Sequence, residues 1–140
     1  MTDRHGPIRI VGYKVEIDGV ETPGWRSVIL PASSTETASG SGVDGWGDTT
    51  FQDLEMERAY DDDDAVLVDW RNEVIDGDED GLKELAVTII NDEGEDVEKW
   101  TFEDAWITYY EPPRVDPFGD SNVASERITV AYDSFEREEV

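Results

Sequence analysis

The sequence contains no cysteine and a single histidine, His5, in its 140 residues. The absence of cysteine excludes disulfides, thiolate metal sites and cysteine nucleophiles. One histidine excludes a histidine dyad and any metal site built from several imidazoles. No apolar run approaches the roughly 18 residues that a membrane-spanning helix needs. Residues 1–8 form a polar leader without a signal-peptide pattern. We therefore expect no metal, no cofactor and no membrane insertion.

Signatures of catalysis are also missing. The chain has no glycine-rich phosphate loop of the kind that cradles nucleotides. Paired carboxylates carry little information in a sequence where acidic residues are abundant everywhere. We expect a protein that is not an enzyme, and we assign no catalytic residue.

Lysine is scarce: the 11 basic residues include only Lys14, Lys83 and Lys99, against 36 acidic residues, and the formal net charge is −25. Such a charge repels nucleic acids and anionic lipids, so specific nucleic-acid binding is not expected. Acid-rich, lysine-poor composition resembles that of proteins from organisms with molar cytoplasmic salt. The Debye length falls from about 8 Å at 0.15 M to about 3 Å at 1 M, so high salt relieves the self-repulsion.

A disordered acidic chain is the alternative, but apolar residues make up 37% of the sequence and include five tryptophans. Apolar and polar residues also alternate with the period of half-buried strands. The predicted strands cover residues 11–17, 25–30, 49–60, 85–90, 97–102 and 127–133. The first two are expected to form a hairpin, and residues 85–90 are apolar enough for a strand buried on both faces.

One amphipathic helix is predicted over residues 62–76. Leu67, Trp70 and Val74 recur at i, i+3 and i+7, and Gly77 ends the pattern. Four acids, Asp61–Asp64, precede the helix. They form either a cation site or, as we favour, a helix N-terminus that acidic side chains stabilise. The fold class that follows is mainly β: an antiparallel sandwich or barrel of six or seven strands with one central helix.

A second acidic segment, Asp76–Gly81, begins like a calcium-binding EF-hand loop, with carboxylates at positions 1, 3 and 5 and glycine at position 6. The bidentate glutamate required at position 12 is replaced by Val87. We interpret the segment as an acidic turn. A small acidic calcium-binding module is kept as the alternative function.

Residues 31–47 are rich in Ser, Thr and Gly and contain almost no large side chain until Trp46. Such a segment is either a flexible loop or, because long structureless loops are uncommon in compact domains, one that orders against a neighbouring subunit. Residues 136–140 form a charged tail that we expect to fray. The length predicts a single domain over residues 1–140.

Aromatic residues concentrate between Trp100 and Arg114. Each large ring can bury roughly 150–250 Å², so this stretch must lie in a core, a subunit interface or both. Its alternation is interrupted at Asp104 and Ala105, and a strand must end at Pro112 and Pro113 for lack of N–H donors.

The order and spacing of several short motifs resemble the tail tube proteins of contractile phages and of extracellular contractile injection systems. The resemblance covers roughly residues 13–135. The matching segments are Tyr13–Gly19, Leu54–Arg58, the helix with Trp70, Ile89–Gly94, the run formed by Trp100, Phe102, Ala105, Trp106, Tyr110 and Pro113, and Val123–Ala124 followed by Glu126.

This resemblance implies a structural protomer of an inner tube: six copies close into a ring, and rings stack into a hollow tube that conducts DNA or another cargo. The implied partners are a contractile sheath, a baseplate and a terminator or cap protein. Trp70, Trp100, Phe102, Ala105, Trp106, Tyr110 and Pro113 are the implied structural positions. Assembly in the cytoplasm would precede incorporation into a virion tail or a released particle. The acidity then reflects either salt adaptation or a negatively charged lumen.

Overall fold

The computed structural model describes residues 9–38, 42–61, 63–114 and 124–140. The strands are β1 (Ile10–Ile17), β2 (Val20–Thr22), β3 (Trp25–Ile29), β4 (Ser33–Thr37), β5 (Trp46–Phe51), β6 (Leu54–Ala59), β7 (Lys83–Asn91), β8 (Asp96–Glu111), β9 (Ser125–Ala131) and β10 (Ser134–Glu139). The helices are α1 (Val66–Ile75) and two 3₁₀ turns, η1 (Gly42–Gly45) and η2 (Glu79–Gly81).

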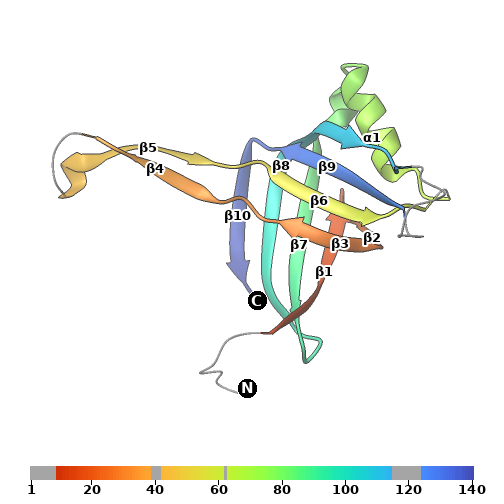
Figure 1. Ribbon diagram of the computed structural model, residues 1–140, viewed down its shortest axis with the longest axis horizontal. Coiled ribbons are helices and arrows are strands. Elements are labelled where there is room, and N and C mark those ends of the chain that lie inside the picture. The colour runs from red at the N-terminus through yellow and green to blue at the C-terminus, as the bar shows by residue number, and fades with distance from the viewer. Residues whose placement is uncertain (1–8, 39–41, 62, 115–123) are drawn as a thin grey trace.

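The long strand β8 joins two halves of one antiparallel sheet with the order β2-β1-β7-β8-β9-β6-β3, and β10 also pairs with β8. The first part of β8 pairs with β7 and β10, whereas its last part, residues 106–111, pairs with β9. Asp104, with a φ of +50°, lies beside this change of partner, between Glu103, which pairs with β10, and Trp106, which pairs with β9. In Figure 1 the strands β3, β6 and β9 run across β1, β7 and β8. The sheet therefore folds over on itself.

The core lies between these two halves. Its fully buried side chains come from β1, β6, β7, β8 and β9 and from the helix: Val15, Leu54, Leu67, Trp70, Leu85, Val87, Phe102, Ala105, Ile107 and Val130. The strand β7 is buried on both faces from residue 85 to residue 89, as the apolar run predicts. The predicted fold class, mainly antiparallel β with one α-helix in the described part of the chain, is confirmed. The predicted number of six or seven strands is too low, since the described residues form ten.

The predicted hairpin between residues 11–17 and 25–30 is wrong. β1 pairs across the Asp18-Gly19 turn with the short strand β2, and β3 pairs with β6 instead. Pro23 cannot donate to a ladder, and Gly24 takes a φ of +88°. The chain therefore leaves the first half of the sheet at this point and enters the second.

Residues 31–47 are not a structureless loop. β4 and β5 form a separate two-stranded antiparallel sheet that projects from the body of the molecule (Figure 1), and we call residues 33–51 the arm. The strand predicted over residues 49–60 is consequently two strands, separated at Gln52 and Asp53. Thr35 and Thr49 lie opposite each other, with hydroxyl oxygens 2.7 Å apart. Threonine favours strands even without an apolar face.

The predicted fraying of residues 136–140 is also wrong, because β10 pairs with β8 from Ser134 to Glu139. Phe135 packs between Trp100 and Phe102, with ring centroids 5.3 and 5.8 Å away. The Arg137 guanidinium lies 5.2 Å from the centre of the Trp100 ring. The half-buried Phe135 ring thus anchors a strand that its charges alone would leave in water.

The helix α1 begins at Val66, four residues later than predicted, and ends one residue earlier, at Ile75. Leu67 and Trp70 are buried, and Val74 packs against the core. The chain ends the helix as the glycine predicts, since Gly77 adopts a φ of +72° and its N–H bonds to the Val74 carbonyl.

Candidate functional site

The predicted signature positions lie in or beside the core. Trp70, Phe102 and Ala105 have no exposed surface, and Trp100 is buried. The Trp70 indole N–H donates to the Gly81 carbonyl at 2.7 Å, which ties the helix to the turn that follows it. These side chains hold the fold and present no surface to a partner in the protomer.

The remaining signature positions lie closer to the surface. Trp106, Tyr110 and Pro113 are half-buried, and β8 ends at Glu111, immediately before the proline pair. The Tyr110 hydroxyl donates to a Glu126 carboxylate oxygen at 2.6 Å. Tyr110 of the aromatic stretch therefore links β8 to β9 through the buried carboxylate of Glu126.

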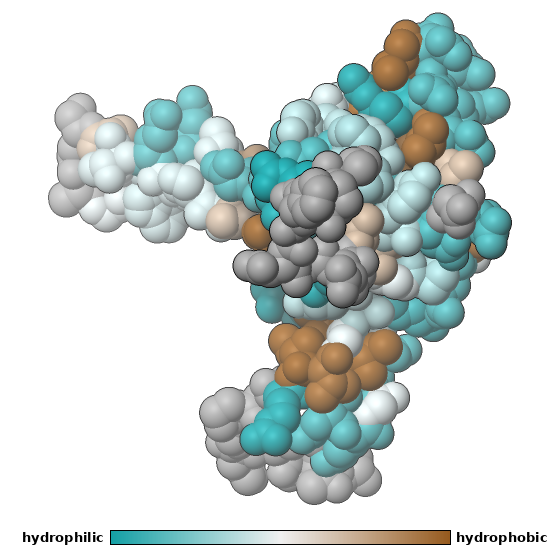
Figure 2. Space-filling model, turned by 45° about the vertical axis from the view of Figure 1, so that its right-hand side comes forward, coloured by the Kyte–Doolittle hydropathy of each residue, from teal (hydrophilic) through white to brown (hydrophobic). Residues whose placement is uncertain are grey.

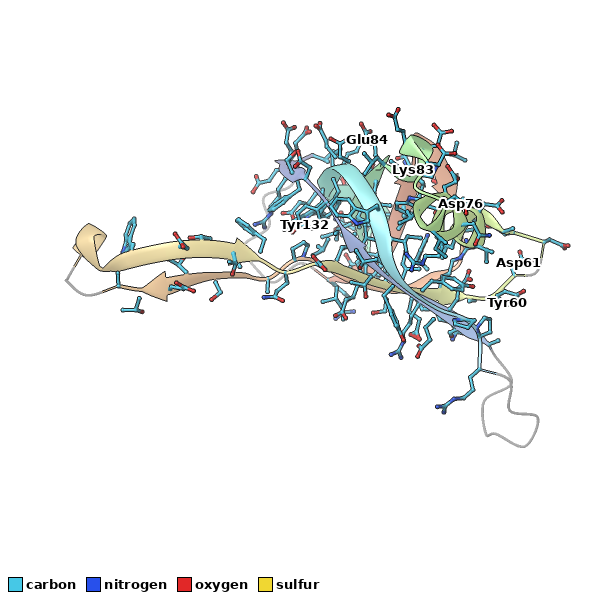
Figure 3. The ribbon with its side chains drawn as sticks, turned by 90° about the horizontal axis from the view of Figure 1, so that it is seen from above. Tyr60, Asp61, Asp76, Lys83, Glu84 and Tyr132 are labelled. Atoms are coloured by element: carbon cyan, nitrogen blue, oxygen red, sulfur yellow. The ribbon has the colours of Figure 1, made fainter. Side chains whose placement is uncertain are left out.

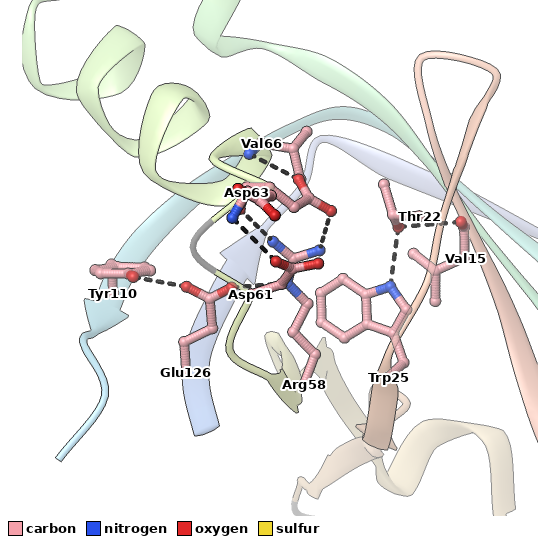
Figure 4. Close-up of polar contacts among 10 residues, drawn as sticks. Val15, Thr22, Trp25, Arg58, Asp61, Asp63, Val66, Tyr110 and Glu126 are labelled. Carbon is pink, nitrogen blue, oxygen red and sulfur yellow. Dashed lines mark hydrogen bonds and ion pairs between the residues drawn. The ribbon is translucent and has the colours of Figure 1, made fainter. Parts of the chain in front are cut away.

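That charge belongs to an ion pair that sequence reasoning missed. Arg58 on β6 and Glu126 on β9 are each only 1% exposed, and Arg58 Nε donates to Glu126 Oε1 at 2.7 Å. The guanidinium also reaches Asp64, at 3.0 Å from Nη1 to Oδ2, and lies 5.6 Å from the centre of the Trp25 ring. Figure 4 shows Arg58 between Glu126 and the turn that leads into the helix.

The strand period could have revealed this pair. Arg58 lies two and four residues after the buried Met56 and Leu54 on β6. Glu126 lies two and four residues before the buried Ile128 and Val130 on β9. Residues that are two or four positions apart lie on the same face of a strand. Both charged side chains therefore had to point into the core. Buried charges are retained when they are paired.

The ion pair changes the titration of the groups around it. Partial burial acts to raise the pKa of Asp64. The hydrogen bonds from the Val66 N–H and from Arg58, together with the Arg58 charge, outweigh it and hold this pKa below its ordinary value. Burial, and then the bond to the Glu126 carboxylate and its charge, raise the pKa of Tyr110. At neutral pH Asp64 therefore stays ionised and accepts its hydrogen bonds, and Tyr110 stays protonated and donates to Glu126.

Among the described residues of the acidic run before the helix, Asp64 is the one whose side chain bonds to the helix terminus, and Asp62 lies outside the described residues. Asp64 Oδ1 accepts the N–H of Val66, the first helical residue, at 3.1 Å. Asp61 instead accepts the N–H of Asp63 at 2.9 Å and closes a local turn. The residue at the N-cap itself is Ala65, which has no side-chain acceptor.

The EF-hand-like segment forms an acidic turn around η2. Asp78 Oδ1 accepts the N–H of Asp80 at 3.0 Å. Within the ranges that the structure describes, no group of three or more acidic or histidine side chains is arranged to hold a metal ion. His5 lies outside the described residues.

The arm differs from these interior groups because both of its faces are open. Every residue of β4 is exposed, and β5 is exposed except at the half-buried Gly47. Trp46 is 68% exposed and Phe51 51%. Figure 2 shows the arm as a thin extension at the left of the body, with few strongly coloured residues of either kind.

Sheet edges offer further surfaces for association. β3 pairs with β6 on one side, and β10 pairs with β8 on one side; neither has a second strand partner among the described residues. Open edges of this kind are templates for pairing with another chain. The helix contacts the last part of β8, where Arg71 donates to the Ile107 carbonyl at 2.9 Å.

A shallow groove of about 310 Å³ lies on the outer face of the sheet half formed by β3, β6, β9 and the end of β8. Its polar lining is mainly charged, with Glu55, Glu57, Glu111 and Arg127. Arg127 bonds to Glu57 at 3.3 Å. The groove therefore lies on a solvent-facing strand surface where charged and apolar side chains alternate.

In the described part of the chain no helix is long and apolar enough to cross a membrane.

Comparison with known proteins identifies a family that this chain matches. A family model described as "T4-like virus tail tube protein gp19" matches residues 11–136. No curated protein sequence matches the chain significantly.

Several solved structures share the fold. A chain of the PVC sheath-tube complex of an extracellular contractile injection system, in the extended state, has a TM-score of 0.75 and 22% identity. That alignment covers 97% of this chain and 94% of the other. A chain of the PVC sheath/tube terminator structure gives 0.79 and 21%, with coverages of 96% and 98%. Hcp1 from Flavobacterium johnsoniae gives 0.66 and 14%, with coverages of 91% and 97%.

Proposed function

The chain belongs to the T4-like virus tail tube protein family, and we propose that it is the protomer of the inner tube of a contractile tail or contractile injection system. In this proposal six copies close into a ring, and rings stack into a hollow tube. The protein acts by assembly and passive conduction, and it carries no catalytic residue.

The proposed partners follow from the same premise. One similar chain comes from a sheath-tube complex and another from a sheath/tube terminator structure. We expect this tube to lie inside a sheath, to start on a baseplate and to end at a terminator or cap. Assembly takes place in the cytoplasm, and the finished tube belongs to a virion tail or a released particle.

The arm is the observation that carries the assembly proposal. A two-stranded hairpin is at best marginally stable in water when it has no apolar face of its own. Neither strand of the arm contains a buried residue, and Trp46 and half of Phe51 are exposed. A surface on another copy would supply the burial that the arm lacks.

The arm also differs from the body in charge. Between Ser33 and Phe51 the sequence has three acidic residues and no basic one, in a chain that has 36 acids. The arm is therefore less acidic per residue than the rest. It can approach a neighbouring acidic body with less repulsion than two bodies would meet.

The test is negative-stain electron microscopy of the purified protein in molar salt. Rings or hollow tubes with six-fold averages are the expected result. A uniform monomer at high protein concentration, both alone and after addition of preformed tube ends as nuclei, would contradict the proposal. A calorimetric calcium titration separates the remaining alternative, since a tube protomer needs no calcium site.

A further inference from the structure

The root of the arm has the construction of a hinge. The ladder between β3 and β6 does not continue into the ladder between β4 and β5, which is a separate sheet. Only residues 30–32 and 52–53 join the two. One backbone hydrogen bond, from the Gln52 N–H to the Ala32 carbonyl at 2.9 Å, connects the two linkers. Short connections of this kind absorb changes of direction unless other contacts hold them.

Two side chains of the body hold this root. The Phe51 ring, at the end of β5, meets the Phe135 ring edge to face, with centroids 5.2 Å apart and planes at 77°. The Tyr132 hydroxyl donates to the Gln52 carbonyl at 2.8 Å. Figure 3 shows Tyr132 beside the point where the arm leaves the body. We call Phe51, Gln52, Tyr132 and Phe135 the root clamp.

The body side of the clamp packs against the core. The Phe135 ring stacks on Trp100 at 5.3 Å, and the Tyr132 ring lies 5.0 Å from the buried Phe102. Tyr132 and Phe135 also contact each other, with centroids 5.7 Å apart. These two rings therefore have defined positions relative to the sheet, and they transmit those positions to the arm.

The two contacts restrain different motions. An edge-to-face ring contact is directional, so tilting the arm away from β10 breaks it. The tyrosine bond holds the backbone of the linker itself, one residue further along the chain. Phe51 has no ring partner other than Phe135 among the described residues. The Phe51 ring therefore contributes to the contact at the base of the arm and is not part of the main core.

We propose that the root clamp fixes the direction of the arm in the free protomer, so that the arm is preset for docking onto a second copy. Tyr132, Phe135 and Phe51 are positioning residues in this scheme. A segment held in its bound direction loses less conformational freedom on association than one that swings. The fixed direction is a property of the single chain, and only the docking step rests on the proposed function.

Single-molecule FRET on the full-length chain tests the fixed direction. The sequence has no cysteine, so Ala38→Cys near the end of the arm and Asp69→Cys on the helix give two unique labelling sites, both exposed. Measurement at high dilution keeps the protein monomeric. The expected result is one narrow distribution of transfer efficiency in the otherwise unchanged chain.

The clamp variants are Phe51→Ala, which removes the arm-side ring, and Tyr132→Phe, which removes only the hydroxyl. We expect both to broaden the distribution, Phe51→Ala more strongly, and Phe51→Tyr to restore it because the ring returns. Trp46→Ala is the matched control: it removes an exposed ring from the same arm without touching the clamp, and the distribution should stay narrow. Circular dichroism verifies that the body remains folded.

Tube formation supplies the second readout. Phe51→Ala should raise the critical concentration for assembly about five- to tenfold, as expected when side chains and a segment must be immobilised on docking, and Phe51→Tyr should restore it. An unchanged narrow distribution in Phe51→Ala would overturn the clamp, whatever happens to assembly. Broadening in Phe51→Ala without any assembly by the parent chain would leave the clamp standing and contradict the proposed function instead.

Discussion

The body and the arm of this protein are stabilised by different means. The body encloses a continuous core in which Trp70, Phe102 and Leu85 have no exposed surface. Among its described side chains, no buried polar atom lacks a hydrogen-bond partner. No residue of β4 or β5 is fully buried, and the order of the arm depends on the pairing of its two strands, which includes the Thr35–Thr49 pair, and on the root clamp.

This difference suggests that the body determines the stability of the protomer and that the arm serves its association with other copies. Burial of apolar surface at about 25 cal/mol per Å² makes the body self-sufficient. The arm adds backbone hydrogen bonds but hardly any buried area, so it contributes little to the stability of the protomer. In the proposed tube, the arm acts through its contacts with another copy. Perturbations of the body should therefore change unfolding, whereas perturbations of the arm should change association.

The largest expected effect is that of deleting the arm. Residues 33–51 are replaced by an Asn-Gly turn, which suits a two-residue hairpin between the neighbouring Ala32 and Gln52. We expect tube formation to be abolished, because the docking element is gone. The free energy of unfolding should fall by about 1 kcal/mol or less, since among the described rings of the arm only Phe51 packs against a ring of the body.

Sedimentation and electron microscopy measure the assembly, and urea denaturation in molar salt measures the stability. Ser34→Ala, an exposed change on the same arm, is the control and should assemble normally. An armless chain that still forms tubes would remove the arm from the assembly mechanism.

The next effect concerns the body. Arg58→Met leaves Glu126 buried, 1% exposed, without its cationic partner. Removing one partner of a buried ion pair costs about 3–5 kcal/mol, because the other charge stays desolvated. We expect a loss of stability in this range, read as a lower midpoint of urea denaturation.

Arg127→Met is the matched control, since the neighbouring Arg127 is 62% exposed in its surface pair with Glu57. Surface pairs contribute about 0–1 kcal/mol, so this change should be nearly silent. Combining Arg58→Met with Glu126→Gln should recover part of the lost stability. If the two arginine variants lose equal stability, the body is not held by this pair.

The same division explains what could be predicted from the sequence. Residues 85–90 and the helix around Trp70 were predictable because apolar periodicity reports burial directly. The aromatic stretch was interpreted as architecture, and its Trp100 and Phe102 are buried. Where the core decides the structure, the local pattern contains most of the information.

The arm was not predictable in the same way. Its strands have no apolar face, so the hydrophobic pattern indicates a loop, and only the threonines favour a strand. Their pairing depends on the root clamp, whose partners Tyr132 and Phe135 lie 80 or more residues further along the chain. Similarly, the acidic residues of β10 predict fraying until Phe135 is seen between two core rings. Contacts between distant segments decide both cases.

A smaller effect is expected from salt. A ring of six copies would carry six times −25, or −150, formal charges. Lowering the salt from 1 M to 0.15 M lengthens the Debye length from about 3 Å to about 8 Å and exposes each body to its neighbours. We expect the critical concentration for assembly to rise at least about tenfold, or about 1.4 kcal/mol.

Light scattering across a potassium chloride series measures this change. Sucrose at matched viscosity is the control, because it does not screen charge. Tubes that persist unchanged at low ionic strength would count against repulsion between bodies as the limiting factor.

The smallest expected effect is that of Asp64→Asn, which changes the residue that links the buried ion pair to the start of the helix. Asp64 accepts from Arg58 and from the Val66 N–H, and these bonds hold its pKa below its ordinary value. A carboxyl group with a lowered pKa in the folded state stabilises the protein above its unfolded pKa of about 3.9. That contribution is lost as the pH falls through the folded value.

Asp64→Asn should therefore cost about 1 kcal/mol at neutral pH, since the charged acceptor is replaced by a weaker one and the site is partly open to water. The difference from the parent chain should begin to shrink below about pH 4, where the carboxyl of the unfolded parent chain gains a proton, and it should disappear below the lower pKa of the folded state. Urea midpoints at a series of pH values, with the exposed Asp63→Asn as control, measure that difference. A loss that stays constant down to the lowest pH would show that Asp64 acts through its shape and neutral hydrogen bonds rather than its charge. In that case the start of the helix would be held by local geometry, and Arg58 would be held chiefly by Glu126.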